Sequence, residues 1–169
     1  MAMRRLLVLL TLTVLTAGCA ASGAVPRPFP QPGPPSPDVQ APFTSDPQRP
    51  AAAVSTALSL RGAPYRNGGG DPSGFDCSGF VSYVFAQQGL FVPRTVAEQF
   101  DSGARVDLAA VAPGDLVFFS TVQPGASHVG IAISSDEFVH APSSAGVVRV
   151  ESLAAPYWAS RFVGGRRLQ

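Results

Sequence analysis

The hydrophobic positions in the middle of the chain follow a helical spacing. Residues 51–62 are rich in alanine and leucine, which favour helices, and they reach Gly62, a typical helix C-cap. Residues 77–90 predict a second helix that ends at Gly89, and residues 92–103 predict a loop followed by a short helix. The apolar face of the second helix consists of Phe80, Val81, Val84 and Phe85.

After Gly114 the apolar positions form short runs instead, rich in β-branched and aromatic residues and separated by turn residues. Such runs are typical of β-strands. They cover residues 115–120, 128–134, 137–141, 147–150 and 161–168. Because the predicted helices precede the predicted strands, the sequence indicates an α+β domain, with an antiparallel β-sheet packed against helices.

The N-terminus resembles a secretory signal of the bacterial lipoprotein type. Basic residues precede the apolar run 6–15, which is too short to span a membrane well. Small residues then lead to Cys19. We therefore expect a signal peptide over residues 1–18, lipidation of Cys19 and attachment to a membrane. An ordinary signal peptide, cut at a small residue between Ala17 and Ala24, is the alternative.

Residues 25–50 hold ten of the 17 prolines and have no hydrophobic periodicity. A segment of this composition lacks the apolar surface that would offset its ordering entropy. We therefore expect a disordered tether over residues 19–50, whose proline-rich part reaches about 75 Å at polyproline dimensions. One folded domain is expected to follow over residues 51–169.

The charge of the chain narrows the range of partners. Its 169 residues carry a formal net charge of +1 and contain no basic run. A nucleic-acid partner normally requires a basic surface, so the composition gives no reason to expect one.

The chain has two cysteines, and lipidation of Cys19 would leave Cys77 without a disulfide partner. Cys77 opens the helix predicted over residues 77–90, where unpaired backbone N–H groups and the helix dipole favour a negative charge. We therefore expect a lowered thiol pKa and a nucleophilic role. A small buried hydrophobic residue is the common alternative for such a cysteine.

The two histidines of the chain, His128 and His140, belong to a predicted β-hairpin. If residues 134–136 form its turn, His140 faces Gly130 across the two strands. The histidines then lie on the same face as diagonal neighbours, about 7–8 Å apart at Cα. A turn with an even number of residues would place them on opposite faces.

Together, Cys77, His128 and His140 form a candidate catalytic group. His128 would act as general base for the thiol, and His140 would orient His128 through its other ring nitrogen. Each histidine taken alone is more commonly a polar residue with structural hydrogen bonds. A metal site formed by these three residues would lack a fourth ligand at a familiar spacing, so we expect neither a metal nor another cofactor.

Several segments resemble the motifs of the NlpC/P60 family of cell-wall cysteine peptidases. The segments DCSGFVSYVF, HVGIAI and FVHAPSSAGVV resemble its three motif blocks in the family order. The segments GAPYRNGGGDPSGF and VPRTVAEQF resemble the approach to the cysteine and the loop that follows its helix. The resemblance covers residues 53–162. It implies a papain-like fold with the cysteine at the N-terminus of the central helix.

The resemblance also implies roles for individual residues. Cys77 corresponds to the nucleophile, His128 to the base and His140 to the third polar residue. Tyr65 corresponds to the tyrosine that helps to form the oxyanion site, together with the backbone N–H of Cys77.

Substrate recognition is implied for Asp76 and Ser78, which flank the nucleophile, and for Arg94, which could meet a substrate carboxylate. From the sequence alone, Asp76 fits a helix N-cap equally well. Arg94 likewise fits a structural salt bridge equally well.

The implied activity is that of an endopeptidase that hydrolyses an amide bond in the stem peptides of peptidoglycan. Members of the family commonly cleave between D-Glu and the diamino acid, and some cleave cross-links. We expect a monomer. Ala20 after Cys19 does not favour inner-membrane retention, so we expect an anchor in the outer membrane with the domain facing the periplasm. Two alternatives stay open: a non-catalytic lipoprotein that binds the wall, and an amidase or transpeptidase on the same scaffold.

Overall fold

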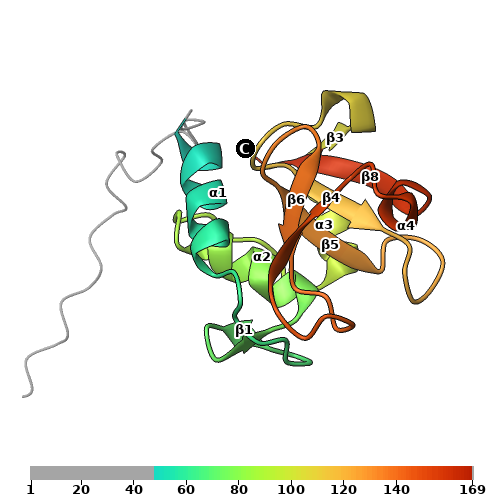
Figure 1. The fold of residues 1–169 in the computed structure, drawn as a ribbon. Coiled ribbons are helices and arrows are strands. Elements are labelled where there is room, and N and C mark those ends of the chain that lie inside the picture. Colours follow the sequence, from blue (N-terminus) through green and yellow to red (C-terminus); the bar gives the residue numbers. More distant parts are fainter. Residues whose placement is uncertain (1–47, 169) are drawn as a thin grey trace, which may run out of the picture. The chain divides into compact units, whose positions relative to one another are not determined.

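One antiparallel β-sheet organises residues 48–168, which are the residues that the computed structural model describes. Six strands lie in the order β3-β8-β4-β5-β6-β7, and every neighbouring pair is antiparallel (Figure 1). The strands are β3 (Ala104–Val106), β4 (Leu116–Phe119), β5 (His128–Ala132), β6 (Glu137–His140), β7 (Arg149–Ser152) and β8 (Phe162–Arg167). This sheet confirms the α+β class that the sequence predicts.

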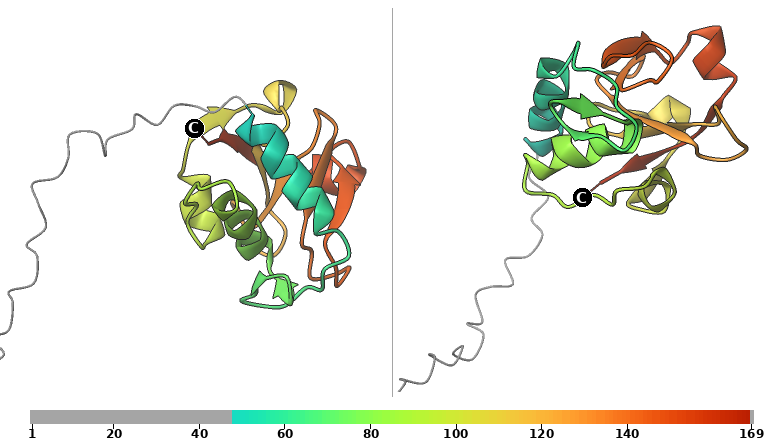
Figure 2. Two further views of the ribbon diagram at one scale, coloured as in Figure 1. Left: turned by 90° about the vertical axis from the view of Figure 1, so that its left-hand side faces the viewer. Right: turned by 90° about the horizontal axis from the view of Figure 1, so that it is seen from below.

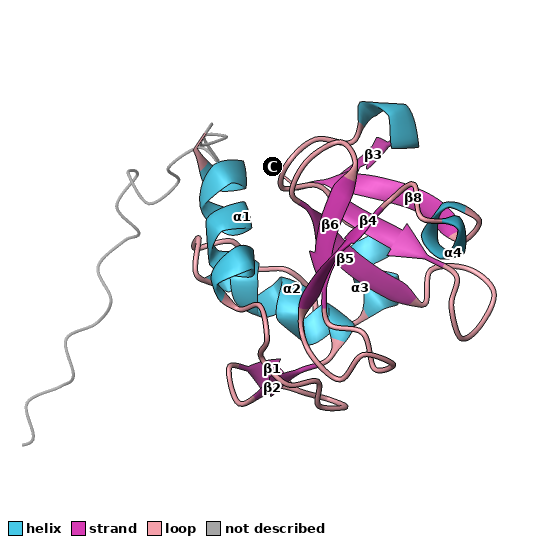
Figure 3. Ribbon diagram, viewed as in Figure 1, coloured by secondary structure: helices cyan, strands magenta, loops and turns pink. Residues whose placement is uncertain are grey.

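Helices and a small hairpin accompany the sheet (Figure 3). They are α1 (Arg49–Ser59), α2 (Cys77–Ala86), α3 (Val96–Phe100), α4 (Pro156–Ala159), the 3₁₀-helix η2 (Leu108–Ala110) and the paired strands β1 (Gly70–Asp71) and β2 (Gly74–Phe75). None of the helices between residues 48 and 168 combines the length and the apolar composition needed to cross a membrane. The predicted signal peptide, Cys19 and residues 19–47 of the predicted tether lie outside the described residues.

Helix α1 differs from the sequence prediction at both of its ends. It begins at Arg49, inside the segment predicted as tether, and has Pro50 in its first turn. Proline is accepted there because the first backbone N–H groups of a helix have no intrahelical partner. The helix ends at Ser59 rather than at Gly62, which has a φ of 86° in the turn that follows.

Strand β7 also begins later than the sequence predicts. The backbone of Val148, in the predicted strand, instead accepts a hydrogen bond from Gly62 at 2.9 Å and donates one to Ala63 at 2.8 Å. This pairing joins the loop after α1 to the segment before β7.

Side chains of the central strands alternate between the two faces of the sheet. Leu116 and Phe118 belong to the hydrophobic cluster that contains α1 and α2. Val117 and Phe119 belong to a second cluster with Trp158 of α4. Figure 2 shows α1 and α2 on one side of the sheet and α4 on the other. The central strands are therefore buried on both faces.

The β5–β6 hairpin has the register that the sequence predicts. Ala132 pairs with Phe138, and the backbone N–H of Ile133 donates to Glu137 at 2.9 Å. Continuing this register places His140 opposite Gly130, so both histidines lie on the same face. The predicted parity of the turn is confirmed.

Helix α2 lies with its first turn directly against the preceding loop. Asp76 caps it, because its side chain accepts a hydrogen bond from the backbone N–H of Gly79 at 2.7 Å. A methyl group on Gly79 would overlap the carbonyl oxygen of Gly69. The predicted apolar face is buried, and it consists of Phe80, Val81, Val84 and Phe85.

Replacing Gly79 with alanine tests this close approach. Helix propensity alone predicts that Gly79→Ala stabilises the fold by about 1 kcal/mol. Overlap with the Gly69 carbonyl instead predicts a loss of about 1–3 kcal/mol in the free energy of unfolding, measured by urea denaturation.

The matched control is Gly70→Ala, because a methyl group on Gly70 has no atom within 4 Å. We expect this control to change the free energy of unfolding by less than about 0.5 kcal/mol. A stabilised Gly79→Ala protein would contradict the packing described above.

Candidate active site

Cys77 is the first residue of α2, and its side chain is half-buried against the sheet. Backbone N–H groups near its sulfur, including those of Ser78 and Val129, act to lower the pKa of the thiol. Val129 directly follows His128, the first residue of β5. The start of the helix and the start of the strand therefore bring the thiol close to the backbone of the residue after His128, although these residues are far apart in the sequence.

The two histidines form a direct hydrogen bond. Nε2 of His128 lies 2.7 Å from Nδ1 of His140, and the two rings are nearly perpendicular, at 83°. Both side chains are buried, with exposed fractions of 8% for His128 and 0% for His140. His140 thus contacts His128 directly through Nε2 of His128, and Nδ1 is the ring nitrogen that the predicted proton transfer from Cys77 would use.

Gly130 makes room for this pair. A methyl group on Gly130 would lie 2.6 Å from the Phe138 ring and 3.1 Å from Cβ of His140. The sequence reasoning missed this residue. A glycine inside a predicted strand was the available signal, because it often marks a close approach of neighbouring groups.

Trp158 of α4 covers the histidines on the face of the sheet that packs against α4. Its ring stacks on His128 with a centroid separation of 5.5 Å and an angle of 26°, and it meets His140 edge-on at 5.0 Å. The sequence reasoning also missed Trp158, since no pattern in the sequence connects it to the hairpin. Its contacts restrict the orientation of both imidazole rings.

Arg94 joins the loop before α3 to the start of α2. Its guanidinium donates to both carboxylate oxygens of Asp76, at 2.9 and 2.6 Å, and to Oγ of Ser78 at 2.9 Å. It also donates to the carbonyl oxygen of Gly69 at 3.1 Å. The two structural readings, an N-cap for Asp76 and a salt bridge for Arg94, are therefore both present. Substrate recognition by Asp76, Ser78 and Arg94 stays a prediction.

Gln99 of α3 holds the same loop in place through buried hydrogen bonds. The side chain is fully buried, and its Nε2 donates to the carbonyl oxygens of Pro93 at 2.7 Å and Ser78 at 3.0 Å. Together with Arg94, it fixes the first turn of α2 and hence the position of Cys77.

Tyr65 lies close enough to the nucleophile to be affected by its charge. Burial raises the pKa of the Tyr65 hydroxyl, and the charges of Cys77 and Asp76 raise it further. The hydroxyl is therefore protonated at neutral pH and available as a hydrogen-bond donor. Its role in an oxyanion site stays a prediction.

The comparison with known proteins decides the family. Residues 62–167 match the model of the NlpC/P60 family. The chain belongs to the NlpC/P60 family.

Curated relatives and a solved structure agree with this assignment. The chain is 43% identical over 114 residues to the probable peptidoglycan endopeptidase LytE of Bacillus subtilis, covering 68% of this chain and 33% of LytE. It is 43% identical over 109 residues to the murein DD-endopeptidase MepS/murein LD-carboxypeptidase of Escherichia coli K12, covering 64% of this chain and 57% of MepS. The chain therefore spans less than two thirds of either relative.

The solved structure of an NlpC/P60 family protein from Bacillus cereus superimposes with a TM-score of 0.66 at 31% identity, covering 70% of this chain and 39% of that one. The papain-like NlpC/P60 fold that the sequence predicts is thus confirmed.

Burial controls the protonation of this NlpC/P60 site. It lowers the pKa of His128 from 6.5 to about 4. Burial, His128 and Arg149 together lower the pKa of His140 from 6.5 to about 2. Both rings are therefore neutral at pH 7.

The expected lowering of the thiol pKa is wrong for the free protein. Burial, followed by the charge of Asp76, raises the pKa of Cys77, whereas the backbone N–H groups of Ser78, Val129 and Cys77 act in the opposite direction. The helix start therefore supplies the stabilising donors that the sequence predicts, but desolvation outweighs them. The resting site pairs a neutral thiol with a neutral imidazole.

No hydrogen bond between residues 48 and 168 joins the sulfur of Cys77 to the His128 ring. Catalytic hydrogen bonds are often long in free enzymes and tighten when substrate binds. Proton transfer from the thiol to Nδ1 of His128 would therefore require these two groups to come together when substrate binds.

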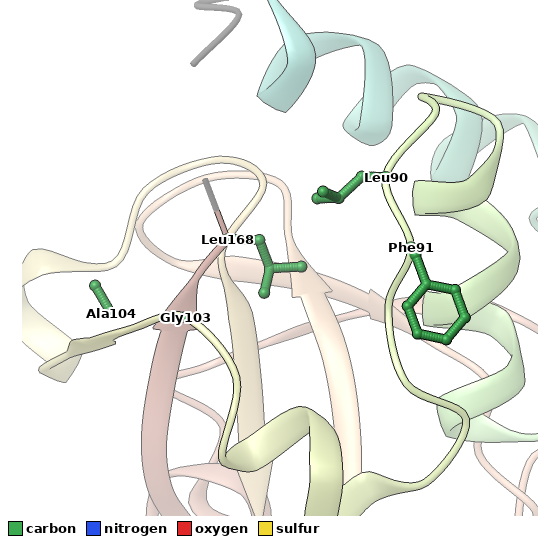
Figure 4. A pocket seen from close by; sticks show the side chains of 5 residues that line it. All are labelled: Leu90, Phe91, Gly103, Ala104 and Leu168. Atoms are coloured by element: carbon green, nitrogen blue, oxygen red, sulfur yellow. The ribbon is translucent and has the colours of Figure 1, made fainter. Parts of the chain in front are cut away.

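No candidate metal site competes with this site in the described part of the chain. No three His, Cys, Asp or Glu side chains of residues 48–168 come together to hold a metal ion. A surface pocket of about 410 Å³ has none of the candidate catalytic residues in its lining (Figure 4). The lining residues are Leu90, Phe91, Gly103, Ala104 and Leu168.

The buried, neutral His128 predicts a pH-dependent stability. An unfolded chain protonates this histidine near its ordinary pKa of 6.5, whereas the folded protein does so only near 4. The unfolded state therefore binds more protons between these values, and stability is lost as the pH falls from 6.5 towards 4. Each such histidine contributes a slope of up to about 1.4 kcal/mol per pH unit.

Urea denaturation between about pH 4.5 and 7, followed by the fluorescence of Trp158, measures this slope. We expect His128→Gln to reduce the slope by the equivalent of one proton, whatever its effect on stability at neutral pH. Equal slopes in both proteins would contradict a neutral, buried His128.

Proposed function

We propose that this chain is a cysteine endopeptidase that hydrolyses an amide bond in the stem peptides of peptidoglycan. The proposal is supported by the hydrogen bond of 2.7 Å between Nε2 of His128 and Nδ1 of His140, and by the Cys77 thiol, which lies near the backbone of Val129 at the start of the same strand. The names of LytE and MepS, a peptidoglycan endopeptidase and a murein endopeptidase, support the choice of substrate.

The first half of the reaction transfers the acyl group to Cys77. Nδ1 of His128 accepts the thiol proton as the sulfur attacks the carbonyl carbon of the amide, so that a C–S bond forms. When the tetrahedral intermediate collapses, the C–N bond breaks and the imidazolium of His128 protonates the departing amine. A thioester on Cys77 and a free amine are the products of this step.

The second half returns the site to its resting state. A water molecule takes the place of the amine and gives a proton to Nδ1 of His128 as its oxygen attacks the thioester carbonyl. The C–S bond then breaks, and the sulfur recovers the proton from His128. The peptide leaves with a new carboxylate, and no cofactor or metal takes part in these steps.

Charge on the carbonyl oxygen develops in both tetrahedral intermediates. Two donors are assigned to this oxygen, the backbone N–H of Cys77 and the hydroxyl of Tyr65. The neutral state of Tyr65 supports this assignment, because only a protonated hydroxyl donates a hydrogen bond.

Substrate recognition is assigned to the network of Asp76, Ser78 and Arg94 at the start of α2. The side chain of Arg94 has an exposed fraction of 45%, although it is paired with Asp76. Its four Nη–H groups are used by Asp76, Ser78 and Gly69, so the Nε–H is the group left to meet a carboxylate of the stem peptide. The free amino group of a stem peptide would in turn be attracted by the carboxylate of Asp76.

The N-terminal segment is assigned to localisation. In this proposal residues 1–18 are a signal peptide, Cys19 carries the lipid and residues 19–48 tether the catalytic domain to a membrane of the cell envelope. A tether is useful here because the lipid lies in a membrane and the substrate lies in the wall.

Replacing Cys77 tests the enzymatic reaction. Purified sacculi are incubated with the wild-type chain or with Cys77→Ala, and the released fragments are identified by mass spectrometry. We expect new stem-peptide termini with the wild type and a loss of more than about 1000-fold with Cys77→Ala, because the nucleophile is absent. The identity of the new termini names the bond that is cleaved.

The same experiment separates the alternatives. Sacculi that stay intact with both proteins, yet retain them in a pull-down, would favour a wall-binding protein. Products that carry an added amine instead of a new carboxylate would favour a transpeptidase.

Lipidation is tested independently of activity. We expect radioactive palmitate to label the wild-type chain in bacterial cells and to leave Cys19→Ala unlabelled, because the acyl chains require this cysteine. An unlabelled wild type would remove the lipid anchor from the proposal and leave the catalytic domain unaffected.

A further inference from the structure

The His128–His140 hydrogen bond can form in two arrangements of protons. In the first, Nε2–H of His128 donates to Nδ1 of His140, and the proton of His140 resides on Nε2. In the second, Nδ1–H of His140 donates to Nε2 of His128, and the proton of His128 resides on Nδ1. Only the first arrangement leaves Nδ1 of His128 free to accept the thiol proton of Cys77.

The surroundings of His140 distinguish the two arrangements. Its Nε2 is buried and has no hydrogen-bond partner among residues 48–168. The nearest acidic group is Glu151, whose Oε1 lies 3.8 Å from this nitrogen. A carboxylate at this distance attracts an N–H group and repels a nitrogen lone pair, so it favours the first arrangement.

Glu151 is held in place by two further contacts. Trp158 donates its indole N–H to Oε2 of Glu151, and Nε of Arg149 lies 3.0 Å from Oε1. The side chain of Glu151 is mostly buried, with an exposed fraction of 23%. Its charge is therefore poorly screened by water and has a fixed direction relative to His140.

The strand pairing explains why these groups meet. In the β6–β7 pair, Phe138 lies opposite Glu151 and His140 lies opposite Arg149. His140 therefore faces three titratable or charged groups, which are His128 on β5, and Arg149 and Glu151 on β7. Of these, Glu151 alone carries a negative charge.

We propose that Glu151 is a positioning residue, which places the proton of His140 on Nε2 and thereby leaves Nδ1 of His128 as the basic nitrogen available to the Cys77 thiol. Glu151 touches neither the thiol nor the scissile bond in this scheme and acts only through His140. The proposal rests on the proposed function for its catalytic consequence, but the proton arrangement itself does not depend on any activity.

Nitrogen NMR of the imidazole rings tests the proton arrangement directly. The chain has just two histidines, so ¹⁵N labelling of histidine gives four ring-nitrogen signals in the full-length protein. In the wild type at pH 7 we expect both rings in the Nε2–H form. In Glu151→Gln and Glu151→Ala we expect the Nδ1–H form of His128 to appear.

Arg149→Gln is the matched control. It removes the other ionic partner of the same carboxylate but leaves the carboxylate in place, so both rings should stay in the Nε2–H form. Glu151→Gln has nearly the same shape as the wild type and keeps an oxygen for the Trp158 N–H. It therefore separates the loss of charge from the loss of packing, even if Glu151→Ala fails to fold.

The kinetic consequence is measured with soluble muropeptides. We expect kcat to fall about 10-fold in Glu151→Gln, which is typical for the loss of a group that orients a functional histidine. KM should change less than twofold, because Glu151 does not contact the substrate. Rings in the Nδ1–H form in the wild type, or an unchanged proton arrangement in both Glu151 variants, would overturn the proposal. Absence of muropeptide cleavage by the wild type would overturn the proposed function alone, since the NMR result is read without substrate.

Discussion

The hydrogen bond between Nε2 of His128 and Nδ1 of His140 sets the requirements that the rest of the site meets. Two imidazole rings can meet in this way only if the β5–β6 pairing places them on one face and if Gly130 leaves room for Phe138 and for Cβ of His140. The bond also commits one nitrogen of His128, so a thiol must approach the other. Helix α2 meets this requirement by presenting Cys77 at the start of β5, where the Val129 N–H contacts the sulfur.

Burial makes this arrangement costly for the fold and useful for chemistry. The rings of His128 and His140 are kept neutral by desolvation, which leaves His128 free to accept a proton at neutral pH. The same desolvation keeps Cys77 protonated until a substrate arrives. Trp158 limits the rotation of the rings, and the contacts of Arg94 and Gln99 hold the helix start. The face of the sheet that packs against α4 therefore supports the site as much as the face that packs against α2.

Much of the architecture follows from local patterns in the sequence. The apolar spacing of α2 and the parity of the β5–β6 turn depend on residues that are close in the chain, so both could be predicted. The short strands β1, β2 and β3 have too few residues to show an alternating pattern. The start of β7 depends on pairing with residues 62–63, more than 80 positions earlier in the sequence, and was predicted two residues too early.

The residues of the site also fall into those that local sequence patterns predict and those that depend on long-range contacts. Cys77, His128 and His140 were predictable because each lies in a motif, and the hairpin fixes the relation of the two histidines. Gly130, Glu151 and Trp158 were missed, since their relevance comes from contacts across strands or between layers. The direction of the Cys77 pKa shift was wrong for a related reason. The helix start is a local feature, whereas burial is a property of the whole packed domain.

In the proposed reaction, Cys77 forms a thioester with the acyl half of a stem peptide. The most direct test adds hydroxylamine, which captures a thioester as a hydroxamate, to muropeptide cleavage by the wild-type chain. We expect the hydroxamate to rise with the hydroxylamine concentration at the expense of the free acid. We expect Cys77→Ala to form neither product. Cleavage that yields only the free acid at every hydroxylamine concentration would contradict a covalent intermediate on Cys77.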